Sequence, residues 1–255
     1  MTAGYGTLGY MKSSPQRTFC TDTQWVGRAH CKHCNIRHLM LFTGLPDAAF
    51  DDLLQPIDNC SFPAGSVLFE EGQNNEAIFS IRSGMVKMMS LTPDGGRRIV
   101  RLLGGGSAIG LELLEPGNRY RHSAIAINTV DACQIPLATM LSLDAEYPQL
   151  CQQVRKRLQE HLDRADQWIV TLGTGPARKR VAHLLLLMIE YSTRPNNDIE
   201  LLGGEDMAAI IGTSTETVSR ILADLKRRRL LEKVSTHTYR GDVTALRAIT
   251  REMVR

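Results

Sequence analysis

The segment Glu205–Arg229 has the sequence EDMAAIIGTSTETVSRILADLKRRR, which is typical of two short helices joined by a tight turn. The first helix is predicted over Glu205–Ile211 and the turn at Gly212-Thr213. Ser214 is a suitable N-cap for a second helix running to about Arg228, because its hydroxyl can accept a hydrogen bond from a free amide of the first turn. The segment therefore predicts a helix-turn-helix.

The second helix has two distinct faces. Its apolar residues recur at i, i+3, i+4 and i+7 and are predicted to enter a core: Val218, Ile221, Leu222 and Leu225. Glu216, Ser219 and Arg220 share another face, and in a helix-turn-helix such a face enters the major groove of DNA. Arg220 can donate two hydrogen bonds to guanine, and Glu216 can accept one from a cytosine amino group. The Ser219 hydroxyl can bond either base. The alternative is that these side chains only solvate an exposed helix.

Further residues extend the predicted DNA-binding surface. They are the remaining polar residues of the first turn and the cations that follow the helix: Ser214, Thr215, Thr217, Lys226, Arg227 and Arg228. A run of cations suits phosphate contact, although alone it is also typical of a solvated surface. From Pro176 onward the chain has 14 Lys/Arg and 10 Asp/Glu, so positive charge gathers in this part. Residues 231–243 predict a small wing and residues 244 onward a closing helix, giving a winged helix-turn-helix domain over residues 175–255.

Upstream, short β-rich runs alternate with turn signals such as Glu71-Gly72, Ser83-Gly84 and Pro93–Gly96. The runs are Ser66–Phe69, Ala77–Ile81, Met85–Met89 and Arg98–Leu102. This spacing predicts an antiparallel barrel or roll, which we assign to residues 45–143.

After Pro148 the pattern changes to that of a long helix. Its apolar residues lie three or four positions apart: Leu150, Val154, Leu158, Leu162, Ala165, Ile169 and Leu172. Charged residues surround this narrow stripe, so the helix needs a partner, and a second copy of itself can supply one. We therefore predict a parallel homodimer through residues 144–174; the alternative is that the helix lies on its own domain. Gly173–Pro176 ends the helix and is a plausible hinge.

The chain has six cysteines, at positions 20, 31, 34, 60, 133 and 151. Without a secretory signal they are interpreted as thiols, ligands or redox groups, not as a disulfide framework. Cys60 and Cys151 are predicted to be structural. Cys31 and Cys34 form a C-x-x-C pair within residues 1–44, which lack periodicity and are predicted to be a loosely structured cap ordered by whatever its cysteines bind. Thiolates favour iron–sulfur clusters or zinc.

Several classes of protein do not match the sequence. The longest apolar run, Leu184–Ile189, is six residues, whereas a membrane span needs about 20, so we expect a soluble, cytoplasmic protein without a membrane partner. No constellation of nucleophile, base and orienting group indicates an enzyme. A redox C-x-x-C belongs at a helix N-terminus beside a βαβ unit, which residues 1–44 lack. A purely structural nucleoid protein would need no β-roll.

From His30 onward the chain resembles the CRP/FNR superfamily of bacterial transcription regulators, and specifically its FNR branch. Ala64–Phe69 and Ile81–Gly84 are similar to the family's turn-and-strand framework. Glu216-x-x-Ser219-Arg220 matches the E-x-x-S-R pattern of the FNR branch, whereas the cyclic-AMP branch carries R-E-x-x-G-R. The resemblance implies an α+β protein with an N-terminal cyclic-nucleotide-binding-like β-roll, a long dimerisation helix and a C-terminal winged helix-turn-helix.

The resemblance also implies partners. A homodimer would bind double-stranded DNA at two-fold symmetric sites with TTGAT-like half-sites, and activation would proceed through contact with RNA polymerase. The turn Thr92–Arg97 is in the region that the family uses for one such contact, although Pro-Asp-Gly is itself strong turn chemistry.

The segment His30–Leu39 is similar to the cluster-binding stretch of FNR, and Cys133 stands where that branch has a distant fourth ligand. The resemblance therefore implies a [4Fe-4S] cluster on Cys31, Cys34 and Cys133 that senses oxygen, nitric oxide or redox state. Where the family's oxygen sensor has a further cysteine, six residues past the pair, this chain has Met40.

A thioether is a poor ligand for such a cluster, so the fourth ligand has to come from elsewhere. Cys20 is the preferred replacement; His33 or His38 can also serve, or the cluster is absent. In the latter case Cys31 and Cys34 hold zinc or form a reversible disulfide, with Cys133 as a small buried hydrophobe. Haem bound by His33, His38 or Met40 is another alternative.

The sequence also leaves open the possibility that the signal is a small ligand bound in the β-roll. Cyclic-nucleotide binders of the superfamily hold the ribose with a G-E-L carboxylate and the phosphate with an Arg-Ser/Thr pair. The corresponding stretch here is taken as Gly106-Ser107-Ala108, without a carboxylate, and His122 stands between Arg121 and Ser123. Both departures count against cyclic AMP as the signal.

Ala165 marks a last departure. It occupies a stripe position that resembles a site with an acidic residue in the FNR oxygen sensor. Two such charges would repel each other across a two-fold seam, and alanine removes this repulsion. We therefore expect a dimer that depends less on its effector.

Overall fold

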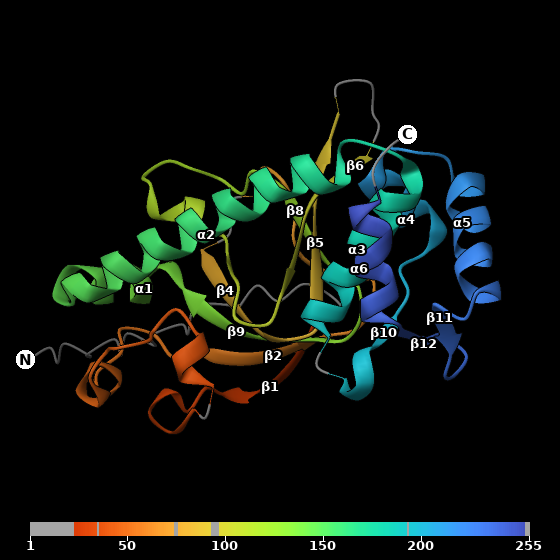
Figure 1. Cartoon of the computed structure of the whole chain (residues 1–255). Coiled ribbons are helices and arrows are strands. Elements are labelled where there is room, and N and C mark those ends of the chain that lie inside the picture. Colours follow the sequence, from red (N-terminus) through yellow and green to blue (C-terminus); the bar gives the residue numbers. More distant parts are fainter. Residues whose placement is uncertain (1–22, 35, 74–75, 93–96, 193, 253–255) are drawn as a thin grey trace, which may run out of the picture.

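The computed structural model describes residues 23–34, 36–73, 76–92, 97–192 and 194–252. A β-roll with an N-terminal segment packed on it is crossed by one long helix, and a helical head lies at the end of that helix (Figure 1). The predicted α+β architecture is confirmed.

Antiparallel strands form the roll, and the predicted strands are confirmed. The five-stranded sheet has the order β1 (Gln24–Arg28), β2 (Asp58–Phe62), β9 (Val130–Pro136), β4 (Ala77–Ser83) and β7 (Ala108–Ile109). The four-stranded sheet has the order β3 (Val67–Phe69), β8 (Ser123–Ala126), β5 (Met85–Leu91) and β6 (Arg97–Gly104). Gly84 turns β4 into β5 with a φ of 84°, and a Cβ there would lie 2.3 Å from the carbonyl oxygen of Thr129. Only glycine fits this turn without a shift of the backbone.

The N-terminal segment is not a loose cap where the structure describes it. β1 pairs antiparallel with β2, and Met40, Leu41 and Phe42 are buried. Short 3-10 turns at Cys31–His33 and Arg37–Leu39 lie between these two anchors. The expectation of a loosely structured cap is therefore wrong for the described residues 23–34 and 36–44, because apolar burial and strand pairing order them.

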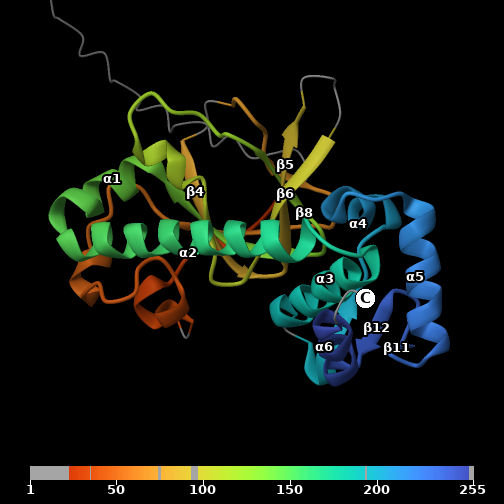
Figure 2. The ribbon, with the colours of Figure 1, turned by 45° about the horizontal axis from the view of Figure 1, so that its top comes forward.

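Two helices follow the roll, α1 (Leu137–Glu146) and α2 (Pro148–Leu172). α2 lies lengthwise across the roll (Figure 2). The ends of its apolar stripe are buried within the chain, at Leu150, Val154 and Leu172. The middle is not, because Leu158, Leu162 and Ile169 are 43%, 60% and 63% exposed. The helix thus lies on its own domain at both ends. Leu158 and Leu162 border a cavity between the helix and the roll and also keep exposed surface that a partner can contact.

The head contains the predicted helix-turn-helix and wing. Its elements are α3 (Ala177–Tyr191), β10 (Asp198–Glu200), α4 (Gly204–Ile211), α5 (Thr215–Arg227), β11 (Leu231–Lys233), β12 (Thr238–Gly241) and α6 (Val243–Arg251). The three strands form one sheet in the order β10, β12, β11. Buried residues of the helices form a common core, among them Val181, Leu185, Ile211, Val218 and Leu246.

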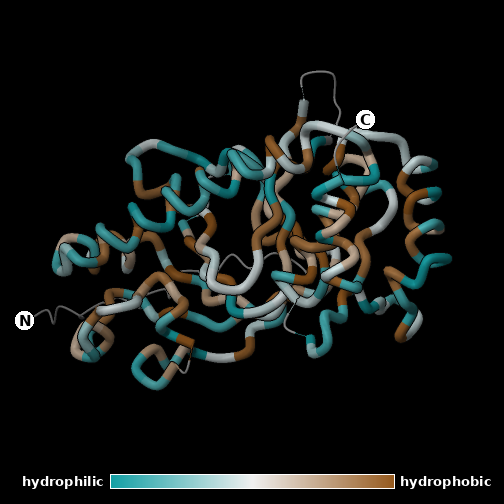
Figure 3. Tube along the Cα trace, viewed as in Figure 1, coloured by the Kyte–Doolittle hydropathy of each residue, from teal (hydrophilic) through white to brown (hydrophobic). Residues whose placement is uncertain are grey.

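The head is packed against the roll. Met85, Ile99 and Leu102 of β5 and β6 belong to the same apolar core as α3 and α4, and the Lys87 ammonium lies 2.6 Å from the carboxylate of Asp206. Figure 3 shows apolar stretches in the strands and helices that meet here, and alternation of polar and apolar residues along α5. No described helix is long and apolar enough to cross a membrane.

Candidate functional site

Cys31, Cys34 and Cys133 line one small cavity of about 20 Å³, the thiol cavity. Its other lining residues are Arg37, Met40, Phe42, Ile57 and Ser80. Cys133 is held by the sheet, since β9 pairs with β2 at Asn59 and with β4 at Ser80. Cys31 opens the first 3-10 turn of the N-terminal segment. The fold therefore brings together the three cysteines that the resemblance implied.

The three cysteines of this cavity are half-buried, and two guanidinium groups lie near Cys31. Burial raises the pKa of Cys31 to about 12, and the neighbouring Cys133 and Cys34 add to the rise, while Arg37 and Arg82 oppose it. Burial also raises the pKa of Cys133, against the opposing effect of Arg82. Cysteine binds a metal in its deprotonated, thiolate form. A positively charged inorganic group and the two arginines would together favour that form.

Met40 takes the place of the missing family cysteine beside the cavity. It is buried, and the Ser80 hydroxyl donates a hydrogen bond to its Sδ over 3.1 Å. His33 and His38 are exposed and do not line the cavity. Cys20 lies outside the described residues. Among the replacements considered from the sequence, the described structure brings neither histidine to the thiols.

The donor set suits an iron–sulfur cluster, whose irons each take a cysteine ligand. Within the described residues, no three His, Cys, Asp or Glu side chains are grouped closely enough to hold one metal ion. A cluster does not require ligands to converge on one point as zinc does. The cavity of about 20 Å³ holds roughly one water molecule. Binding of a cluster would therefore require residues 31–40 to move outward.

A second, larger cavity of about 760 Å³ lies between the roll and α2, and we call it the roll–helix cavity. Its polar lining includes Arg101, Glu112, Arg121, His122 and His161. The sequence predicts the carboxylate position at Gly106–Ala108, where no carboxylate stands. That assignment is wrong for the cavity, because Glu112 follows β7 into its wall and accepts a hydrogen bond from the backbone amide of Arg121 over 3.2 Å. Ala165 also lines this cavity.

Buried polar groups face this cavity. Burial lowers the pKa of His161 to about 4, and Arg101 and Arg164 add to the effect. Its Nε2 is buried and finds no hydrogen-bond partner among the described residues. Burial also lowers the pKa values of Arg101 and His122, whose side chains lie 3.4 Å apart. The cavity can therefore hold a ligand with an apolar body and a polar or anionic end.

The recognition face of α5 has the predicted geometry. Ser214 is the N-cap, and its hydroxyl accepts from the backbone amide of Thr217 over 3.3 Å. Val218 is buried, whereas Glu216, Ser219 and Arg220 are exposed. Thr215 and Thr217 are half-buried. A hydrogen bond from its own backbone lowers the pKa of Glu216, which keeps it ionised.

The cations at the C-terminal end of α5 have partners within the head. The Lys226 ammonium donates to the Tyr239 hydroxyl over 3.1 Å and lies 4.3 Å from the centre of its ring. Arg227 and Arg228 both pair with Asp224 and remain exposed. Lys226 thus ties the recognition helix to the wing through Tyr239, a role that the run of charge did not reveal. Phosphate contact by these residues stays a prediction.

Comparisons with known proteins agree with this architecture. Residues 59–147 match the cyclic nucleotide-binding domain, and residues 179–249 match the Crp-like helix-turn-helix domain. The chain is 31% identical over 186 residues to the CRP-like cAMP-activated global transcriptional regulator of Mycobacterium tuberculosis, covering 71% of this chain and 81% of the relative. The chain belongs to the CRP/FNR superfamily of transcription regulators.

Other members of the superfamily are similar along most of the chain. The fumarate and nitrate reduction regulatory protein of Vibrio cholerae is 26% identical over 207 residues, covering 79% of this chain and 82% of that protein. The structure of FixK2 from Bradyrhizobium japonicum shares the fold, with a TM-score of 0.67 and 22% identity over 78% of this chain and 99% of that one. As a CRP/FNR regulator the protein binds DNA and controls transcription and is not an enzyme.

Proposed function

We propose that this regulator belongs to the FNR branch and responds to oxygen, nitric oxide or redox state through a [4Fe-4S] cluster. Cys31, Cys34 and Cys133 would hold the cluster, with Cys20 as the fourth ligand. The observation that carries the proposal is that cysteines from two distant segments line one buried cavity. The similarity to the Vibrio cholerae fumarate and nitrate reduction regulator supports the branch.

The residues around the thiol cavity have separate tasks in this proposal. The bound cluster would supply an iron–sulfur group whose state depends on oxidants. The three thiolates hold it between the N-terminal segment and β9. Arg37 and Arg82, which lie close enough to Cys31 to oppose the rise in its pKa, offset the negative charge of the thiolates. Charge and hydrogen bonding near the sulfurs set the stability and potential of such clusters.

The output would be sequence-specific binding by a homodimer. Leu158, Leu162 and Ile169 are the exposed part of the α2 stripe and would pack against the same residues of a second copy. Each α5 would enter one half of a two-fold symmetric, TTGAT-like site, with Arg220 as the base-reading cation. The protein would act in the cytoplasm.

Activation would use RNA polymerase contact through the turn Thr92–Arg97. Residues 93–96 of this turn lie outside the described residues, so the contact rests on the family resemblance.

The test is purification without oxygen, followed by a visible spectrum and by iron and acid-labile sulfide assays before and after exposure to air. A brownish, sulfide-containing chromophore that air destroys is the expected result. A colourless protein would overturn the cluster and leave zinc or thiol chemistry, whereas a sharp Soret band would indicate haem. Cys20→Ser then tests the fourth ligand by the same assays.

The roll–helix cavity supports a second candidate signal, a small anionic ligand. Glu112 can accept hydrogen bonds from hydroxyl groups, Arg101 can pair with an anion, and His161 Nε2 lacks a partner among the described residues. Titration calorimetry with cyclic AMP tests the simplest case. Binding that Glu112→Gln weakens would support a nucleotide signal, and no heat with the unmodified protein would set cyclic AMP aside.

A further inference from the structure

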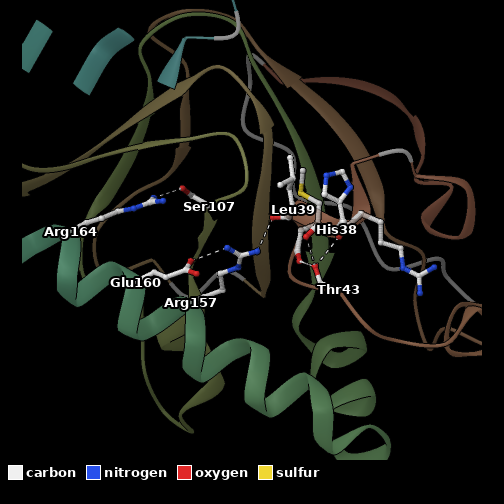
Figure 4. A network of polar contacts seen from close by, with 9 residues as sticks. His38, Leu39, Thr43, Ser107, Arg157, Glu160 and Arg164 are labelled. Atoms are coloured by element: carbon white, nitrogen blue, oxygen red, sulfur yellow. Dashed lines mark hydrogen bonds and ion pairs between the residues drawn. The ribbon is translucent and has the colours of Figure 1, made fainter. Parts of the chain in front are cut away.

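One hydrogen bond joins the cysteine-bearing segment directly to α2. The Arg157 guanidinium, through Nη2, donates to the carbonyl oxygen of Leu39 over 2.8 Å. Figure 4 shows Arg157 reaching from the helix to this carbonyl group. Leu39 ends the second 3-10 turn, and the next residue, Met40, lines the thiol cavity. The helix therefore holds a backbone atom immediately beside the cavity wall.

The Leu39 end of this contact is tightly bound to its neighbours. The Thr43 hydroxyl lies 3.0 Å from the carbonyl oxygens of Arg37 and His38 and 2.7 Å from that of Met40. The single hydroxyl hydrogen of Thr43 is shared among these three carbonyl oxygens, so residues of the turn are all bonded to the same side chain. Arg37 is tied in turn to Asp47 over 2.6 Å. Residues 37–43 should consequently move as one unit when the cavity changes.

The Arg157 end is equally well placed to move α2. Only 16% of its side chain is exposed, and Nη1 lies 2.9 Å from the carboxylate of Glu160, one turn along the helix. Its Nε is buried and has no hydrogen-bond partner among the described residues. If the Leu39 carbonyl moved away, the largely buried Arg157 guanidinium would lose a hydrogen-bond partner, and this loss costs free energy. Leu158, the adjacent residue, belongs to the exposed stripe.

Arg164 provides a natural comparison two turns further along α2. Its guanidinium donates to the Ser107 hydroxyl over 3.3 Å, on the roll (Figure 4). Ser107 is not among the residues that line the thiol cavity. The two arginines therefore make similar contacts from the same helix, but only Arg157 bonds the cysteine-bearing segment.

The thiol cavity is too small for a bound group, so binding would move the residues that Arg157 contacts. At about 20 Å³ it has room for roughly one water molecule, so a larger group bound by the thiols must push residues 31–40 outward. We propose that Arg157 is the positioning residue that transmits this movement to α2. This inference rests on the proposed function for the identity of the bound group.

Hydrogen–deuterium exchange of the full-length protein tests the route. Exchange is compared between protein purified without oxygen and the same protein after air exposure, in peptides that cover residues 30–45 and 148–172. A coupling of 1–3 kcal/mol corresponds to about 5–150-fold, and a change of this size is expected in both peptides of the unmodified protein. In Arg157→Ala the change in 148–172 should fall to about onefold, with iron, sulfide and the change in 30–45 retained.

Two further variants separate transmission from simple stabilisation. Arg164→Ala removes a cation of the same helix, its hydrogen bond to Ser107 on the roll and its contact with the Tyr191 ring, whose centre lies 5.7 Å away. It should leave the change in residues 148–172 intact. Arg157→Lys can still donate to the Leu39 carbonyl and should restore part of it. If Arg157→Ala shows the full change in 148–172, or if Arg164→Ala loses as much, the proposal is overturned.

Failure of the cluster is distinguishable from failure of this route. If the anaerobic protein contains no iron and sulfide, the proposed function fails. The same peptides are then compared between the wild-type protein and Cys34→Met, which places a larger side chain in the wall of the cavity. A change in 148–172 that Arg157→Ala abolishes supports the route, and a change confined to 30–45 while Arg157 is present refutes it.

Discussion

The recognition helix and the thiol cavity lie at opposite ends of the proposed signal path, and they are built differently. α5 has its own N-cap, a buried face and exposed polar residues, so the surface proposed to read DNA is complete within one element. The thiol cavity is assembled from a 3-10 turn and the central strand β9, and it is closed to about 20 Å³. In the proposed function the output surface is formed in advance, whereas the input site would have to rearrange to bind a cluster.

This difference predicts separable effects. Changes at the input should alter what the protein binds and how the roll and α2 respond, without altering the geometry of α5. Changes at the output should alter DNA recognition without altering the bound group. Both parts share one chain, in which the head is packed on the roll through Met85, Ile99 and Leu102, so each variant needs a control that measures the other function.

The largest effect is expected from Cys31→Ser. A hydroxyl is a poor ligand for iron in a thiolate site, and even changes outside the ligand shell cost 10–100-fold in metal affinity. Affinity for the cluster should therefore fall by at least about tenfold, and the iron and sulfide content per protein should fall with it. Cys151→Ser is the matched control, since Cys151 does not line the cavity. Wild-type iron content in Cys31→Ser would refute the ligand assignment.

The next effect concerns His161 at the roll–helix cavity. Its pKa is lowered from 6.5 to about 4, so the unfolded chain binds more protons between these values. The contribution of His161 to the free energy of unfolding is therefore fully present above about pH 6.5. It is lost as the pH falls toward 4, and the loss is up to about 3 kcal/mol. His161→Gln should flatten this dependence. Urea unfolding of both proteins between pH 4 and pH 7.5 measures it, and parallel curves would contradict the prediction.

Sequence patterns predicted the output end well because its determinants are local. The 3.6-residue periodicity, the Ser214 cap and the turn at Gly212 all lie within one short segment, and each is present as expected. The roll strands were recognisable for the same reason, since alternating β-rich runs and turn residues are local signals.

The input end depends on contacts between distant residues, and there the predictions were incomplete. Burial of Met40–Phe42 and the pairing of β1 with β2 order a segment that has no periodicity of its own. Glu112 was missed because the carboxylate position was counted along the sequence, whereas the cavity wall continues beyond β7. The tie between Lys226 and Tyr239 likewise joins two elements.

A smaller effect should come from the base-reading surface itself. Arg220→Ala removes the cation proposed to bond guanine, which costs about 1–3 kcal/mol of discrimination between matched and mismatched sites. Arg228→Ala should weaken binding to all sequences equally and reduce the salt slope by about one. Competition titrations with a TTGAT-like duplex and a scrambled duplex at several salt concentrations separate the two. Equal losses of discrimination would contradict base reading by Arg220.

The smallest effect tests whether α5 is formed in advance. Ser214→Ala removes the N-cap hydrogen bond to Thr217, and loss of such a cap costs about 1 kcal/mol of stability. Asp242→Ala removes the corresponding cap of α6, an acceptor for the Ala245 amide over 3.0 Å, and should cost about as much. Chemical unfolding measures both. Ser214 begins the helix that is proposed to enter the groove, so only Ser214→Ala should also weaken specific DNA binding. If the two variants lose DNA affinity equally, the cap acts through overall stability and not through the placement of the recognition helix.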